Sequence, residues 1–127
     1  MATQQIPATI QSLIDVYYHG IARRAGWEEA IADSFVFVGG NAGNGSRGRA
    51  AYAEVMRQFG RVFETVEVKE SIVNGDRACV IATYGVVSPS GKRRTFDIAE
   101  VWTAQEGRLT SLVIYFDTAS WRTFMES

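Results

Sequence analysis

The chain has 127 residues, of which 46% are hydrophobic and 21% charged, and its formal net charge is −1 at pH 7. This length suits one domain with its own core over residues 1–127, and a balanced charge without a basic run argues against nucleic acid and anionic membrane surfaces as partners. No stretch approaches the roughly 20 apolar residues of a membrane-spanning helix, and residues 1–5 lack the features of a signal peptide. We therefore expect a cytoplasmic protein.

The first third of the chain predicts two helices and a short strand. Apolar residues recur at helical spacing and form one stripe, namely Ile6, Ile10, Leu13, Ile14, Tyr17 and Ile21. We expect this helix to end between Gly20 and Gly26. A second, shorter helix fits Trp27–Asp33, because two glutamates fall in its first turn, where the helix dipole favours them. Ser34–Val38 then reads as a short strand.

The segment Gly39–Gly48 is unusually rich in glycine. Within it, residues 43–48 satisfy the G-x-G-x-x-G pattern of a dinucleotide-binding loop. That loop requires its first glycine directly after a strand of a parallel βαβ unit. Here the strand-like run ends at Val38, and the segments that follow predict antiparallel strands. We therefore interpret Gly39–Gly48 as a flexible loop over the mouth of the fold.

The second half of the chain predicts a four-stranded antiparallel meander. It follows an amphipathic helix over Arg49–Phe63, whose apolar side carries Tyr52, Val55, Met56, Phe59 and Phe63. Three glycine-containing turns then separate four pieces rich in β-branched and aromatic residues, which are Val66–Val73, Ala78–Val87, Arg94–Thr103 and Leu109–Phe116. A last helix is expected over Thr118–Met125.

With this order of elements the chain resembles the NTF2-like superfamily, which includes ketosteroid isomerase, the SnoaL-like polyketide cyclases and limonene epoxide hydrolase. The resemblance covers nearly the whole chain. Its local marks are Tyr17-Tyr18, Trp27, Ile31, Phe35, Arg47-Gly48, Gly107-Arg108-Leu109 and Tyr115-Phe116-Asp117. It implies an α+β fold in which a curved antiparallel sheet, made of a short strand plus the four-strand meander, wraps around three N-terminal helices. The result is a cystatin/NTF2-like cone with an internal apolar pocket.

Strand alternation places Glu100 among large apolar neighbours. Within Arg94–Thr103, one face carries Phe96, Ile98, Glu100 and Trp102. If this face is buried, the charged form of the Glu100 carboxyl group is disfavoured and its pKa rises, as a proton donor to an oxyanion requires. On the alternative interpretation, Glu100 pairs with an arginine on a solvent-facing or dimer-facing surface.

The resemblance to ketosteroid isomerase matches Glu100 with the acid that donates a hydrogen bond to the substrate oxygen. It matches Tyr17 with the second donor, or Tyr18 if the helix is rotated. The aspartate that serves that enzyme as base has no match, because residues 38–41 contain no carboxylate. The Asp-Arg-Asp set of the epoxide hydrolase is also incomplete, since Ala82–Tyr84 supplies neither an arginine nor an aspartate.

Two further titratable residues are catalytic candidates, and each also has a purely structural interpretation. Asp117 matches the last acid of the epoxide hydrolase and is a pocket acid or base, or else the N-cap of the last helix. His19, the only histidine, is a general base or else a helix-surface or cap residue. Without cysteine or Glu-x-x-His spacing near His19, we expect no metal site and no cofactor.

Two function classes therefore remain. The first is a cofactor-independent isomerase, cyclase or dehydratase that acts on a small apolar, oxygen-bearing molecule, with Glu100, Tyr17, Asp117 and His19 as catalytic candidates. The second is a non-catalytic ligand-binding or dimerisation module of the same fold. In both classes the expected pocket residues are Tyr18, Phe37, Tyr52, Met56, Phe59, Ile98, Trp102 and Tyr115.

The predicted sheet has apolar residues on both faces. In the second meander strand, residues of both parities are apolar, for example Cys79, Val80, Ile81, Ala82 and Val86. If the helices cover one face, the other face exposes a large apolar patch. We therefore expect a homodimer that pairs through this sheet face, as the family resemblance also implies.

Overall fold

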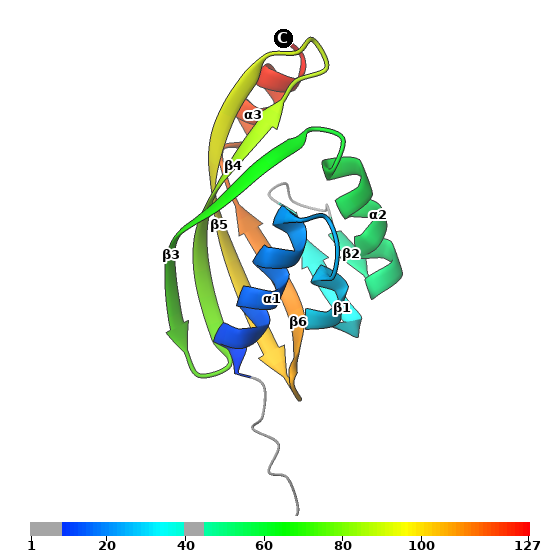
Figure 1. Ribbon diagram of the computed structural model, residues 1–127, viewed down its shortest axis with the longest axis vertical. Coiled ribbons are helices and arrows are strands. Elements are labelled where there is room, and N and C mark those ends of the chain that lie inside the picture. Colours follow the sequence, from blue (N-terminus) through cyan, green and yellow to red (C-terminus); the bar gives the residue numbers. More distant parts are fainter. Residues whose placement is uncertain (1–8, 40–44) are drawn as a thin grey trace, which may run out of the picture.

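The computed structural model describes residues 9–39 and 45–127, which contain three α-helices, one 3₁₀ helix and six strands (Figure 1). In chain order the elements are α1 (Ile10–Ala22), η1 (Trp27–Ala30), β1 (Ile31–Val38), β2 (Gly45–Arg47), α2 (Arg49–Phe59), β3 (Phe63–Asn74), β4 (Arg77–Val87), β5 (Arg93–Gln105), β6 (Arg108–Tyr115) and α3 (Thr118–Met125). Within these described ranges, no helix is both long and apolar enough to cross a membrane.

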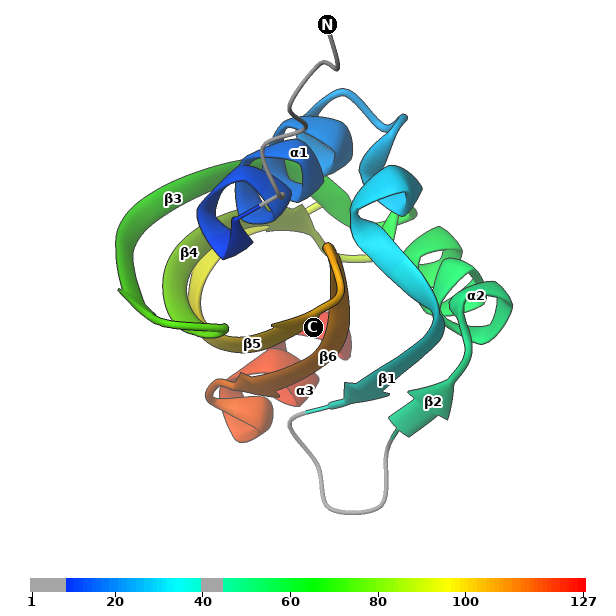
Figure 2. The same ribbon diagram turned by 90° about the horizontal axis from the view of Figure 1, so that it is seen from below.

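The six strands form one curved, unclosed sheet in the order β2-β1-β6-β5-β4-β3. The meander from β3 to β6 is antiparallel, as predicted, and β1 joins it by pairing in parallel with β6. Figure 2 looks along the curved sheet and shows α1 lying across its concave side. The fold is therefore α+β, with the helices and the concave sheet face enclosing the core.

Helix α1 is amphipathic, and its buried side meets the sheet. The helix starts after Thr9, whose side chain accepts a hydrogen bond from the Ser12 amide at 3.1 Å, a typical N-cap contact. Near its other end, Gly20 packs directly against the start of η1. A Cβ atom at position 20 would lie 2.5 Å from the backbone nitrogen of Trp27. Only glycine permits this close approach, which fixes Trp27 against the helix.

The second predicted helix is shorter than expected. The chain forms only the 3₁₀ helix η1 and turns into β1 at Ile31, so the prediction of a helix over Trp27–Asp33 was wrong at its C-terminal end. Ile31 is fully buried and pairs with Leu109 of β6. Pairing and burial in the sheet therefore outweigh the local helical pattern.

The long amphipathic helix also ends early. Helix α2 stops at Phe59 rather than at Phe63, and the residue that follows is Gly60, a poor helix former. Phe63 instead begins β3, where it pairs with Val86 of β4. Its side chain is buried, as predicted for the apolar side of the helix, but Phe63 belongs to a strand.

Part of the predicted glycine-rich loop is a strand. Gly45–Arg47 forms β2 and pairs antiparallel with Val36–Val38, so the sheet has six strands rather than five. Residues 40–44 and the start of the first predicted helix at Ile6 lie outside the described residues. Of the three helices expected before the meander, two are α-helices and one is the short η1, while α3 has the predicted bounds.

Candidate functional site

A cavity of about 140 Å³ lies between the concave face of the sheet and helix α2. Its lining is apolar and aromatic apart from one carboxyl group and three phenol groups. The lining residues are Tyr17, Phe37, Tyr52, Val55, Met56, Phe59, Tyr84, Ile98, Glu100, Leu112, Ile114, Phe116 and Trp121. Seven helices and strands contribute, so the cavity is a product of the whole fold.

Glu100 is buried on the concave face of β5 and is held by two phenol groups. The hydroxyl groups of Tyr18 and Tyr84 each donate a hydrogen bond to its Oε1 atom, both at 2.7 Å. The indole Nε1 of Trp102 donates to the Tyr18 hydroxyl at 3.1 Å, which orients that hydroxyl toward Glu100. Both phenols use Oε1, and the other oxygen, Oε2, accepts no hydrogen bond from the described residues.

Burial and hydrogen bonding act on the Glu100 carboxyl group in opposite directions. Burial raises its pKa from the ordinary value of 4.5 to about 7, although the hydrogen bonds from Tyr84 and Tyr18 lower it. Burial also raises the pKa values of both tyrosines, as does the negative charge of Glu100. The phenols therefore stay protonated as donors, while Glu100 exchanges its proton near neutral pH.

A second pair of hydroxyl groups lies on the same cavity wall. The Tyr17 and Tyr52 hydroxyls are 2.6 Å apart and share one hydrogen bond. Tyr17 also lies within hydrogen-bond range of the Met56 sulfur, at 3.9 Å. Burial raises the pKa of Tyr17 well above its usual value and that of Tyr52 as well. This pair is a neutral polar contact in an otherwise apolar wall.

Most residues expected at the pocket lie at this cavity or directly behind it. The cavity is lined by the expected residues Glu100, Tyr17, Phe37, Tyr52, Met56, Phe59 and Ile98. Tyr18 and Trp102 stand behind Glu100 as its hydrogen-bond support. The tyrosine that meets Glu100 is thus Tyr18 and not Tyr17. The carboxyl group faces the core, so the alternative of an exposed ion pair for Glu100 was wrong.

The structure does not bring three of the expected residues to the cavity. Asp117 is exposed, and its carboxylate accepts a hydrogen bond from the Ser120 amide at 3.0 Å as the N-cap of α3; hydrogen bonds from Ser120 lower its pKa. His19 is exposed on α1, beside a separate hollow between α1 and β3. Tyr115 is 61% exposed on the outer side of the sheet.

The sequence reasoning missed Tyr84, the second donor to Glu100. Its signal was alternation along β4, which puts Tyr84 on the same face as Val80 and Ala82, both fully buried. It pairs with Phe96 on β5, and its long side chain reaches along the strand to Glu100. The aromatic residues Phe116 and Trp121 also line the cavity, although neither was among the expected pocket residues.

The raised pKa of Glu100 predicts a pH-dependent stability. The folded protein binds this proton more tightly than the unfolded chain, so stability is highest when the carboxyl group is protonated and falls as pH rises from about 4.5 to about 7. We expect this group to account for a loss of about 3 kcal/mol across that window. Urea unfolding at several pH values measures it. The free energy of unfolding of wild type, relative to that of Glu100→Gln, should decrease as pH rises across this window. A difference that stays constant with pH would contradict the burial argument.

The hydrogen bonds from the two phenols predict how the pKa of Glu100 changes when either tyrosine is replaced. Tyr18→Phe and Tyr84→Phe each remove a hydrogen bond that favours the carboxylate, so each should raise the pKa of Glu100 above the wild-type value. Tyr17→Phe is the matched control, because Tyr17 donates no hydrogen bond to Glu100. Carbon-13 NMR of the Glu100 carboxyl group measures all four proteins. Equal shifts in the three variants would show that the hydrogen bonds are not what holds this pKa down.

Comparison with known proteins agrees with this fold. A sequence model of the SnoaL-like domain matches residues 16–112, and no curated protein sequence matches the chain. Among solved structures, TerC co-crystallised with polyporic acid is 25% identical, with a TM-score of 0.83 over 92% of this chain and 98% of that chain.

Two further structures share the fold at lower identity. An NTF2-like protein of unknown function from Burkholderia pseudomallei is 20% identical, with a TM-score of 0.82 over 92% of this chain and 97% of that chain. A hypothetical protein with a ketosteroid isomerase-like fold from Catenulispora acidiphila, in complex with trimethylamine, is 15% identical, with a TM-score of 0.75 over 90% of this chain and 92% of that chain. The matched family model and the shared architecture together place the chain in the SnoaL-like family of the NTF2-like superfamily.

Proposed function

We propose that this chain, as one domain over residues 1–127, binds a small apolar, oxygen-bearing molecule in the Glu100 cavity and moves a proton within it without a cofactor. Isomerases, cyclases and dehydratases carry out chemistry of this kind. The observation that carries the proposal is one carboxyl group in an apolar cavity, with one oxygen fixed by two phenols and the other without a hydrogen bond from residues 9–39 and 45–127. A titratable group of this kind, matched to neutral pH, is what general acid–base catalysis requires.

The proposed step uses one carboxyl group twice. Charged Glu100 takes a proton from an acidic carbon of the ligand at Oε2, which leaves the electron pair on the ligand as an enolate. Glu100 then returns the proton to another atom of the same molecule, and the carboxylate is restored. Within the described residues that line the cavity, Glu100 is the only carboxyl group. The same residue is therefore acid and base in turn.

The Tyr17–Tyr52 pair supplies the contact for the ligand oxygen. Two hydroxyl groups carry two hydrogens, and their mutual hydrogen bond uses only one. If Tyr52 donates that bond, the second hydrogen is on Tyr17, next to the weakly accepting sulfur of Met56; if Tyr17 donates it, the second hydrogen is on Tyr52, which has no other acceptor among the described residues. The second hydrogen is therefore available to a carbonyl or enolate oxygen in the cavity, where a fixed donor in an apolar setting stabilises developing negative charge.

The size of the cavity limits what enters it. A volume of about 140 Å³ is close to the roughly 150 Å³ of an engineered apolar cavity that binds benzene. The part of the ligand inside is therefore a single six-membered ring or an equivalent. Small-molecule binding is also supported by the neighbours, since TerC was co-crystallised with polyporic acid and the Catenulispora protein is in complex with trimethylamine.

Deuterium incorporation into cyclohexanone tests the proton transfer. In D₂O, the wild-type protein should accelerate exchange of the protons beside the carbonyl group, and Glu100→Gln should lower that rate by about 10²-fold or more. The exposed Glu106→Gln, in the β5–β6 turn, is the matched control and should retain the wild-type rate. Proton NMR measures the loss of the exchanging cyclohexanone signal. Broadening of the cyclohexanone lines in the same spectra reports its binding to the protein.

The same experiment separates the two function classes. If cyclohexanone binds but wild type gives no exchange above the buffer rate, the protein is a ligand-binding module and the catalytic proposal fails. If exchange is equal in wild type and Glu100→Gln, the assignment of the proton-transferring group fails. Exchange that depends on Glu100 supports the enzyme class.

We also propose that two copies pair through the convex face of the sheet. The strand register aligns Ile72, Cys79, Val101 and Val113 in one row across β3 to β6. The adjacent row aligns Ile81, Ala99 and Tyr115. Ile72 is 58% exposed and Tyr115 61% exposed, so these rows form an apolar surface of the kind that marks an interaction site, with Glu70 of β3 at the edge of the second row.

Light scattering after size-exclusion chromatography tests this pairing. At micromolar concentration the wild type should have twice the 14.0 kDa mass of the chain. Val101→Glu places a charge in the middle of the apolar rows and should give a monomer. The exposed Gln58→Glu on α2 carries the same added charge elsewhere and should remain a dimer. A monomeric wild type would rule out the pairing.

A further inference from the structure

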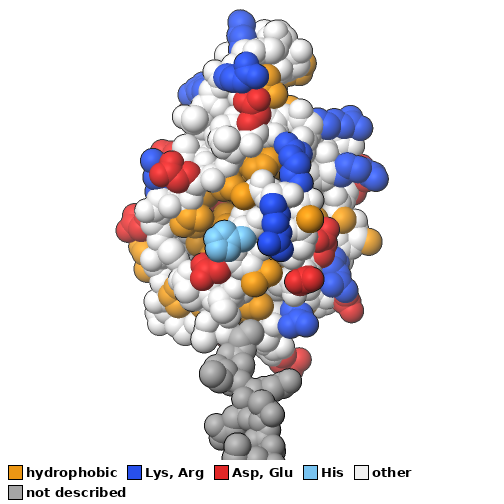
Figure 3. Space-filling view, in the orientation of Figure 1, with side chains coloured by type: hydrophobic (Ala, Val, Ile, Leu, Met, Phe, Trp, Pro, Cys, Tyr) orange, Lys and Arg blue, Asp and Glu red, His pale blue; other side chains and the backbone are white. Residues whose placement is uncertain are grey.

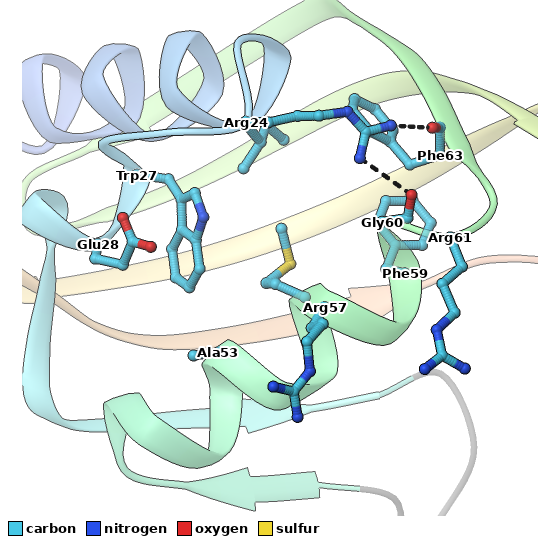
Figure 4. A pocket seen from close by; sticks show the side chains of 11 residues that line it. Arg24, Trp27, Glu28, Ala53, Arg57, Phe59, Gly60, Arg61 and Phe63 are labelled. Carbon is cyan, nitrogen blue, oxygen red and sulfur yellow. Dashed lines mark hydrogen bonds between the residues drawn. The ribbon is translucent and has the colours of Figure 1, made fainter.

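A groove of about 590 Å³ lies beside the cavity, on a neighbouring face of helix α2 and between this helix and the segment that joins α1 to η1 (Figure 4). Its middle is apolar, with Trp27, Met56 and Phe59. On this face of the molecule, basic side chains lie beside exposed apolar side chains around α1 and α2 (Figure 3). The groove is thus larger and more polar at its rim than the Glu100 cavity.

One layer of side chains separates the groove from the cavity. Along α2, Tyr52 and Val55 face the cavity, whereas Ala53 and Arg57 face the groove. Met56 lies between these two helical faces and lines both spaces, as Phe59 does. A methionine side chain has three rotatable bonds and adapts to its surroundings, so this wall can open at position 56 by side-chain rotation.

The aromatic floor of the groove touches the hydroxyl-bearing wall of the cavity. The Trp27 ring packs edge-on against Tyr52 with ring centroids 5.6 Å apart, and against Tyr17 at 6.3 Å. These are the two tyrosines that supply the polar contact inside the cavity. A ligand substituent that leaves the cavity past Met56 therefore continues directly along Trp27.

The charges at the two ends of the groove differ. Figure 4 shows Glu28 beside Trp27 at one end, and Arg24 and Arg61 near Gly60 at the other. Arg24 donates to the carbonyl oxygens of Gly60 and Phe63, at 3.1 and 2.6 Å. Because these partners are neutral, the positive charge of Arg24 is not compensated there.

Of the two other arginines at the groove, Arg61 strengthens this polarity and Arg57 does not. Arg57, on the rim, is paired with Glu54. Arg61 has no carboxylate within salt-bridge distance in the described part of the chain. The end of the groove formed by Arg24 and Arg61 therefore attracts an anion, and the end at Glu28 repels one.

We propose that this groove holds the anionic end of the molecule whose ring occupies the Glu100 cavity. The ligand class is then a cyclic or aromatic carboxylate with a short chain between the ring and the carboxylate. The ring enters the cavity, the chain passes Met56 and lies on Trp27, and the carboxylate reaches Arg24 and Arg61. This inference rests on the proposed function, because the ring must occupy the cavity for the chain to emerge there.

Isothermal titration calorimetry with phenol, 5-phenylpentanoate and 5-phenylpentanamide tests the inference. Wild type should bind the carboxylate about fivefold or more tightly than the amide of the same shape. Arg61→Gln should lower this preference about threefold, and Glu28→Gln should raise it, because one change removes an attraction and the other a repulsion. Arg108→Gln, an exposed arginine in the β5–β6 hairpin, should leave the preference unchanged.

The binding of the three probes distinguishes failure of the groove proposal from failure of the cavity proposal. If phenol binds but the carboxylate has no advantage over the amide, or if the advantage survives Arg61→Gln unchanged, the groove assignment fails and the cavity proposal stands. If phenol does not bind while the carboxylate binds through Arg61, the cavity proposal fails and the groove is an independent anion site. If none of the probes binds, both are overturned. Cooperative unfolding of every variant at the wild-type midpoint establishes that the changes are local.

Discussion

The central constraint on this structure is a buried carboxyl group that is held by two phenols. Glu100 lies buried on the concave face of β5, where its charge loses most of its solvation, and the hydroxyls of Tyr18 and Tyr84 replace part of that solvation. A buried carboxyl group without such partners would cost several kcal/mol. The surrounding elements are arranged so that both donors reach the same atom, and the cavity exists beside it.

The donors come from opposite sides of the core, so their meeting depends on the packing of α1 against the sheet. Tyr18 is on α1 and Tyr84 is on β4. The position of α1 is fixed in turn by its contact with η1, where Gly20 allows the backbone of Trp27 to approach closely. A glycine that does not itself line the cavity thus helps to determine the geometry of the carboxyl group.

Strand-level features of the site could be predicted from the sequence, whereas helix rotation could not. Period-two alternation in β5 correctly put Glu100 on the same face as Ile98 and Trp102, and all three are buried. On α1, however, Tyr17 and Tyr18 are adjacent and both are buried. Neighbouring helical positions differ by about 100° in direction, so only the docked helix decides which hydroxyl meets Glu100. Tyr84 was missed because its contact depends on cross-strand register.

The placement of both phenol donors on one oxygen has a consequence for the energetics of proton transfer. Protonation at Oε2 leaves Oε1, Tyr18 and Tyr84 where they are, and Trp102 continues to orient the Tyr18 hydroxyl. No heavy atom has to turn when the carboxyl group gains or loses its proton. For the proposed proton transfer, this arrangement implies a small reorganisation energy, because folding has already oriented the dipoles that water would otherwise have to rearrange.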